Sequence, residues 1–269
     1  MPEVVTSQVS LHVEVDGQGV PVTVLAHGLT NSCHELAPFT PLVPGTKVRF
    51  CFRGHGHSRT LPDAGFGFAD FANDLEAVAD AYGATCAVGT SLGAGAISNL
   101  LTRRPDRFER IVFLLPAGLD RPFLYKERFR HTAWLIEGKE PDEALEAILS
   151  DPERAGGYLD MPWRIELDKA RWEHVEPDSL ARAIRGVIED FPVSDRELLR
   201  AVTAPVLLVC VDDDPIHPIE LGRILAGLMP NAELVEFGNV DELFSAIPAL
   251  VQRVTAFLSG DASGRLPRS

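Results

Sequence analysis

Short apolar segments that alternate with helical patterns constrain the fold of this chain more than any other feature. Seven segments have the composition of buried strands: SLHVEV, PVTVLAH, TKVRFCF, ATCAVG, ERIVFLL, APVLLVCV and AELVEF. Several are apolar at nearly every position, as expected for strands with both faces buried in a parallel sheet. Helical patterns lie between them, for example over residues 68–82, where the pattern ends at Gly83. The alternation predicts an α/β fold with a mostly parallel sheet covered by helices on both faces.

One region interrupts this alternation. From Leu119 to Val193 helical patterns continue without a convincing strand, and all three tryptophans fall there. We expect a core of residues 1–118 and 194–269, with residues 119–193 inserted as a helical cap over the carboxyl edge of the sheet. Residues 260–269 are small and polar and predict a flexible tail. We expect a binding pocket lined in part by members of one group in the cap: Phe123, Tyr125, Trp134, Tyr158, Met161, Trp163 and Trp172.

Composition excludes several classes of partner. The 39 acidic and 25 basic residues give a net charge of −14, which disfavours nucleic acid and anionic membranes as partners. No apolar segment approaches the ~18 residues of a membrane span, and the N-terminus does not resemble a signal peptide, so we expect a cytoplasmic protein. The four cysteines form no CxxC pair, which predicts buried thiols and no metal site. Whether the chain forms a homodimer is left open.

The segment Gly89-Thr90-Ser91-Leu92-Gly93 joins a strand pattern to a helical pattern. In such a turn the serine side chain projects above the sheet, and side chains at the two glycine positions would collide with it. The amino end of the following helix also favours a developing negative charge. The segment therefore predicts a nucleophilic serine at Ser91.

A second loop supports this interpretation. The strand pattern VTVLAH ends at His27-Gly28, and the loop that follows can direct the Leu29 N–H group toward the same pocket. Together with the Leu92 N–H group it would form a two-donor oxyanion hole. We interpret His27 as structural.

These motifs, HGLTNS, FRGHGHS, VGTSLGAG and PVLLVCVDDDPIHP, occur in the order found in the α/β-hydrolase fold superfamily, and the chain resembles its serine-nucleophile branch. The resemblance covers nearly the whole chain except the predicted cap. It implies that Ser91 is the nucleophile and that Asp214 is the acid, although Val211 replaces the usual glycine of that segment. Asp212 and Asp213 remain competitors for the acid. Cys51 stands where the family usually has an aspartate.

The resemblance fails at the residue that should act as the base. The family's histidine follows the last strand, where alignment on Pro248 places Asp241 instead. The eight histidines are His12, His27, His34, His55, His57, His131, His174 and His217, and none follows position 217. The usual order of serine, acid and histidine can therefore be completed only by His217.

Three interpretations of this departure remain open. His217 is a relocated base on the same loop as Asp214, or another histidine reaches the serine, with His34 and His131 as candidates. In the third, no efficient base exists, and Asp241 faces Asp214 as a second carboxylate. The chain would then be a ligand-binding relative, or a lyase, isomerase or cyclase that needs no cofactor.

The first interpretation predicts a serine hydrolase that cleaves a small or medium apolar ester, lactone or thioester through an acyl-enzyme on Ser91. His217 is the first choice of base, and the Leu29 and Leu92 amides hold the oxyanion. The reaction requires a small-molecule substrate and neither a metal nor an organic cofactor.

Overall fold

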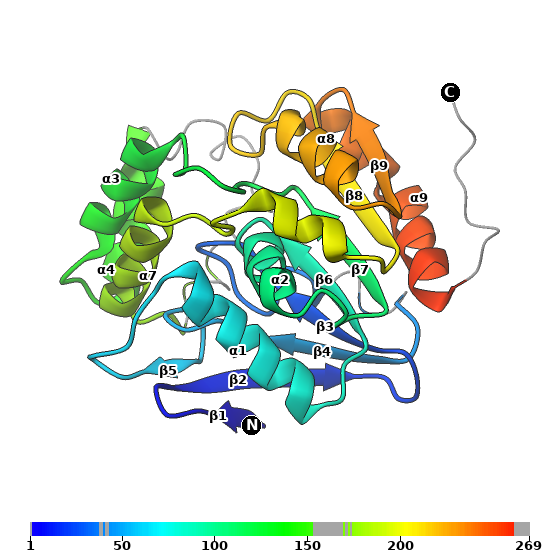
Figure 1. Cartoon of the computed structure of the whole chain (residues 1–269). Coiled ribbons are helices and arrows are strands. Elements are labelled where there is room, and N and C mark those ends of the chain that lie inside the picture. The colour runs from blue at the N-terminus through cyan, green and yellow to red at the C-terminus, as the bar shows by residue number, and fades with distance from the viewer. Residues whose placement is uncertain are drawn as a thin grey trace.

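A single sheet forms the centre of the molecule (Figure 1). The computed structural model describes residues 2–37, 40, 43–152, 169, 172 and 174–260. Among these, nine strands form the sheet, in the order β1-β2-β4-β3-β6-β7-β8-β9, with β5 paired to β2. The predicted tail after Gly260, at residues 261–269, lies outside the described residues.

Six neighbouring strands are parallel, as the apolar segments predicted. They are β4 (Thr46–Phe50), β3 (Val22–Ala26), β6 (Cys86–Thr90), β7 (Arg110–Leu114), β8 (Val206–Val211) and β9 (Ala232–Phe237). The remaining strands pair antiparallel at one edge: β1 (Glu3–Val5), β2 (Val9–Asp16) and β5 (Arg59–Thr60). All seven predicted strand segments are present, and the expectation of a mostly parallel α/β sheet is confirmed.

Successive side chains of each strand point to opposite faces of the sheet. Because both faces of the central strands carry apolar side chains, helices cover both faces. On β8, Leu208 belongs to the core cluster that packs α1 (Phe68–Ala81), α2 (Leu92–Arg103) and α8 (Ile219–Leu228) onto one face. Its neighbours Leu207 and Val209 belong to the cluster on the other face, where α9 (Val240–Ser259) packs.

The chain between β7 and β8 contains the predicted cap. Its described residues form α3 (Lys126–Ile136), α4 (Pro141–Ser150), α7 (Pro177–Glu189) and the 3-10 helix η2 (Arg196–Ala201), and no strand occurs among them. The first three helices lie together at one side of the sheet (Figure 1). They share a small core of their own, which includes Trp172 and packs against Leu29 and Ile216.

The cap aromatics have different surroundings. Trp134 is 64% exposed, whereas Trp172 is buried. Tyr158, Met161 and Trp163 lie outside the described residues.

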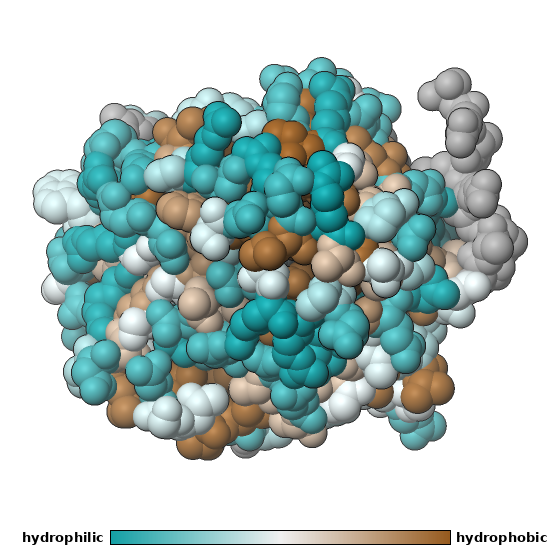
Figure 2. Space-filling view, viewed as in Figure 1, coloured by the Kyte–Doolittle hydropathy of each residue, from teal (hydrophilic) through white to brown (hydrophobic). Residues whose placement is uncertain are grey.

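All four cysteines are buried and free. Within the described ranges, no helix is long and apolar enough to cross a membrane. The face shown in Figure 2 is largely hydrophilic, with small apolar patches between polar side chains.

Candidate active site

Ser91 occupies a strained turn between β6 and α2. Its φ is 49° and its ψ is −103°, a conformation that residues other than glycine rarely adopt. A Cβ atom on Gly93 would lie 2.2 Å from the Ala26 carbonyl oxygen, and one on Gly89 would lie 2.6 Å from the Gly93 carbonyl carbon. Only glycine fits at these two positions, which explains the spacing of the motif.

Two main-chain amides beside Ser91 are available to a ligand. The N–H groups of Leu29 and Leu92 have no hydrogen-bond partner within the part of the chain that the structure describes. By contrast, the Gly28 N–H group donates to Glu35 Oε2 at 2.7 Å, and the Gly93 N–H group donates to the His27 carbonyl at 3.1 Å. Leu29, Ser91 and Leu92 line one pocket. This arrangement can accept a negatively charged oxygen.

His217 approaches Ser91 from the loop between β8 and α8. Its Nε2 atom lies 3.1 Å from Ser91 Oγ, and its Nδ1 atom lies 2.7 Å from Asp214 Oδ2. With the imidazole proton on Nδ1, the ring donates to Asp214 and accepts the serine hydroxyl proton at Nε2. Both side chains are 16% exposed. The structure thus brings together a serine, an imidazole and a carboxylate in hydrogen-bonding order.

The short loop after β8 holds the acidic member of this series. Asp214 Oδ1 accepts the Ile216 N–H group at 2.9 Å and the His217 N–H group at 3.2 Å. Burial acts to raise the pKa of Asp214, but the hydrogen bond and charge of His217, with the two backbone N–H groups, lower that pKa below its ordinary value. The carboxylate is therefore ionised and able to orient the imidazole.

The other sequence candidates lie elsewhere. Asp213 is exposed, and Asp241 is an exposed residue in the first turn of α9. His131 pairs with Asp151, with 2.8 Å between Nε2 and Oδ2. His34 Nε2 lies 3.3 Å from Glu14 Oε1. Within the described ranges, none of these four side chains hydrogen-bonds to Ser91.

Two further side chains hold the loop after β3: Glu35, which sequence reasoning missed, and His55, which the FRGHGHS motif indicated only as part of a turn. Glu35 accepts the Gly28 N–H group through one oxygen and the Asn31 side-chain amide through the other. The fully buried His55 accepts the Thr30 N–H group at Nε2, at 3.3 Å. Burial lowers the pKa of His55 to about 4, so this imidazole is neutral near pH 7. No local pattern marks Glu35, because its partners lie in an irregular loop. The motif around His55 does not indicate its contact with the Thr30 N–H group, which lies 25 residues away in the chain.

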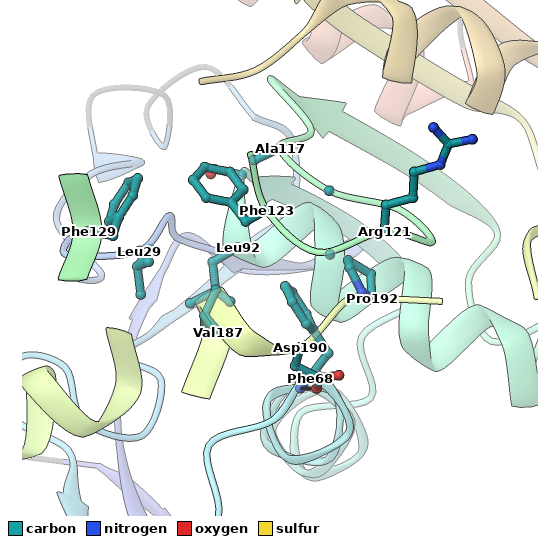
Figure 3. A pocket seen from close by; sticks show the side chains of 13 residues that line it. Leu29, Phe68, Leu92, Ala117, Arg121, Phe123, Phe129, Val187, Asp190 and Pro192 are labelled. Atoms are coloured by element: carbon teal, nitrogen blue, oxygen red, sulfur yellow. Dashed lines mark hydrogen bonds between the residues drawn. The ribbon is translucent and has the colours of Figure 1, made fainter. Parts of the chain in front are cut away.

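The pocket beside Ser91 is narrow and apolar (Figure 3). Its volume is about 30 Å³, and it adjoins a wider cavity of about 300 Å³ that shares Ala117, Gly118, Arg121 and Phe123 with it. The larger apolar side chains that line it are Leu29, Phe68, Leu92, Phe123, Phe129, Val187 and Pro192. Two charged residues, Arg121 and Asp190, also line it.

Comparison with known proteins gives a consistent result. The model of the "Alpha/beta hydrolase family" matches residues 23–246. The chain is 28% identical to RutD of Caulobacter sp. (strain K31), to which carbamate hydrolysis is ascribed, over 80% of this chain and 81% of that protein. It is also 28% identical to carboxylesterase YbfK of Bacillus subtilis (strain 168), over 71% of this chain and 64% of that protein.

A solved structure shares the whole fold. The enol-lactonase of Burkholderia xenovorans LB400 superposes with a TM-score of 0.77 at 20% identity, covering 96% of this chain and 100% of that one. At this identity the likeness concerns the fold alone. The family match spans most of the chain and both flanks of the Ser91 turn, and the chain therefore belongs to the alpha/beta hydrolase family.

Proposed function

We propose that this protein is a serine hydrolase that cleaves small or medium apolar esters, lactones or thioesters through an acyl-enzyme on Ser91. The observation that carries the proposal is the continuous series from Ser91 Oγ through the His217 imidazole to the Asp214 carboxylate, with steps of 3.1 and 2.7 Å. A positioned base of this kind typically contributes about 10²–10⁴-fold to the rate.

The mechanism follows from these contacts. The Ser91 oxygen attacks the substrate carbonyl carbon while His217 Nε2 takes the hydroxyl proton. Asp214 stabilises the imidazolium, and the Leu29 and Leu92 N–H groups donate to the oxyanion. The imidazolium returns its proton to the leaving alcohol or thiol as the carbonyl re-forms. Water then attacks the acyl carbon while His217 takes a water proton, and the imidazolium returns that proton to the Ser91 oxygen as the acid product leaves.

The pocket supports the choice of substrate. An apolar lining with few charged groups favours an apolar acyl or alcohol portion, and the small volume next to Ser91 favours a short one. We assign the wider cavity to the remainder of the substrate. We further propose that α3, α4 and α7 form the cap, because their shared core packs against Leu29 and Ile216, next to the reacting groups.

Labelling with a fluorophosphonate tests the nucleophile. We expect wild-type protein to be labelled and Ser91→Ala to remain unlabelled, because only an activated serine reacts with the probe. Unlabelled wild-type protein that still binds a small apolar ester would contradict the proposal and favour the ligand-binding alternative.

Hydrolysis of p-nitrophenyl butyrate tests the base. We expect His217→Gln to lower kcat by about 10²–10⁴-fold. The matched control is His131→Gln, which removes an imidazole that is paired to a carboxylate away from Ser91, and should leave kcat unchanged. Full activity in His217→Gln would show that another group takes the proton.

A further inference from the structure

A second group of reactive side chains lies outside the pocket, between β2 and the loop after β3. Glu14 Oε1 lies 3.3 Å from His12 Nε2, 3.3 Å from His34 Nε2 and 3.6 Å from Cys33 Sγ. Two imidazole nitrogens and one sulfur therefore converge on a single carboxylate oxygen. The hydrolytic mechanism uses none of these four side chains.

These separations resemble the edges of a tetrahedral zinc site. Tetrahedral zinc bonds of about 2.0–2.3 Å to nitrogen, oxygen and sulfur place neighbouring ligand atoms about 3.3–3.8 Å apart. The ligand atoms of His12, Glu14 and Cys33 all lie within 4.8 Å of one another. Side-chain shifts of about 1 Å would therefore close the group around an ion. His34 is not part of this group of three; its imidazole, 44% exposed, contacts Glu14 Oε1 and would have to turn toward the group to become a fourth ligand.

Neighbouring groups already hold these side chains in place. Arg49 Nη2 binds the other oxygen of Glu14 at 2.7 Å, which leaves Oε1 directed at the group. The same guanidinium donates to the Cys33 carbonyl at 3.3 Å. His34 Nδ1 lies 3.3 Å from Ser32 Oγ, so Nε2 remains the coordinating nitrogen. Such outer contacts are typical of metal-binding histidines and carboxylates.

Charge at this place also favours a cation. Glu14 and Asp16 carry two negative charges, and Arg49 offsets one of them. The hydrogen bond with Cys51, burial and the Glu14 charge raise the pKa of the Cys33 thiol, so this side chain is a neutral thiol. A bound divalent cation would have to displace its proton, and binding would therefore release a proton.

We propose that His12, Glu14, Cys33 and His34 bind a divalent cation of the zinc type. The sequence predicted no metal site, because the four ligands come from two distant segments and form no CxxC or HxxxH spacing. Cys33 and His34 are followed directly by Glu35, which holds the Gly28 amide beside Ser91. Metal binding would therefore also fix the loop that carries the Leu29 amide, whether or not the hydrolase proposal holds.

Metal titration of the full-length chain tests the site. Protein is reduced, stripped with a chelator and titrated with Zn²⁺ by calorimetry, and with Co²⁺ by absorption spectroscopy. We expect one equivalent of Zn²⁺ to bind with micromolar or tighter affinity and to raise Tm. We also expect a thiolate-to-Co²⁺ charge-transfer band. Cys33→Ser should abolish the band and weaken Zn²⁺ binding at least tenfold.

Two control variants test whether Zn²⁺ binding depends on the proposed ligands and not on any thiol or imidazole. Cys210→Ser removes another buried free thiol, on β8, and His131→Gln removes another imidazole paired to a carboxylate. Both should bind Zn²⁺ like wild type. Since a buried His12 variant could fail to fold, the exposed His34→Gln is the second test and should weaken binding at least tenfold. Absence of stoichiometric binding, or unchanged affinity in both Cys33→Ser and His34→Gln, would overturn the proposal.

Discussion

The buried ion pair between Arg53 and Asp74 offers a quantitative test of how the loop after β4 is held. The Arg53 Nε and Nη2 atoms lie 2.8 and 2.7 Å from the two oxygens of Asp74, and the Arg53 N–H group donates to the same carboxylate at 3.2 Å. The two side chains are 3% and 1% exposed. Asp74→Ala would leave a buried guanidinium with the half-buried Asp70, at 3.3 Å, as its remaining carboxylate.

We expect Asp74→Ala to lower the free energy of unfolding by about 3–5 kcal/mol, because the buried guanidinium loses its bidentate carboxylate partner and keeps only the longer contact with Asp70. An unfolding entropy of about 2.1 cal/mol/K per residue gives about 0.6 kcal/mol/K for a chain of 269 residues. A loss of about 4 kcal/mol therefore lowers Tm by about 7 °C. Arg53→Met combined with Asp74→Leu replaces both charges with apolar groups and should lose at most about 1 kcal/mol.

Urea unfolding followed by circular dichroism, with calorimetry for Tm, measures both variants. The matched control is Glu137→Ala, since Glu137 also binds an arginine, Arg185, at 2.6 Å, but the two side chains are 51% and 40% exposed; its loss should cost less than about 1 kcal/mol. If Asp74→Ala costs no more than Glu137→Ala, or if the double variant is as unstable as the single one, the reasoning about burial is wrong.

Three further predictions concern the site. Because burial holds the pKa of His55 near 4 in the folded protein, against about 6.5 unfolded, the unfolded chain binds the proton first as the pH falls. Stability should therefore decrease by about 3 kcal/mol between about pH 6.5 and 4, and urea unfolding should find this component missing in His55→Asn. Asp214→Asn should lower kcat for p-nitrophenyl butyrate by about 10³–10⁴-fold with the fold intact, since the amide cannot hold the productive imidazole tautomer; a loss below tenfold would remove Asp214 from the mechanism. Phe123→Ala should enlarge the pocket and raise kcat/KM for p-nitrophenyl octanoate relative to acetate by about tenfold; an unchanged ratio would mean that Phe123 does not limit acyl length.

Local chemistry made much of the fold predictable. Strands β6, β7 and β8 are largely apolar on both faces, so their positions could be recognised without their neighbours. A Cβ atom at position 89 or 93 would collide with nearby backbone atoms, so both positions require glycine. The turn could therefore be predicted from the segment itself. The strands at residues 3–5 and 59–60 are too short to carry a pattern, and they form only by pairing with β2.

The base could be predicted only because the order of residues along the sequence left one candidate histidine after Asp214. His217 could be named because no histidine follows it, but its approach to Ser91 depends on the path of the loop after β8. Glu35 and Asp74 could not be named, because their contacts with the Gly28 N–H group and the Arg53 side chain form only when the loops fold, seven and 21 residues apart in the chain. Sequence patterns carry no direct record of such contacts.

The placement of Asp214 and His217 three residues apart on one loop has a consequence for how this protein tolerates change. Their mutual geometry is set within a single short segment by the Ile216 and His217 N–H groups, so the final strand and helix supply no atom to the proposed mechanism. Strand β9 is half exposed at the sheet edge. We therefore expect substitutions in β9 to lower the free energy of unfolding before they lower kcat.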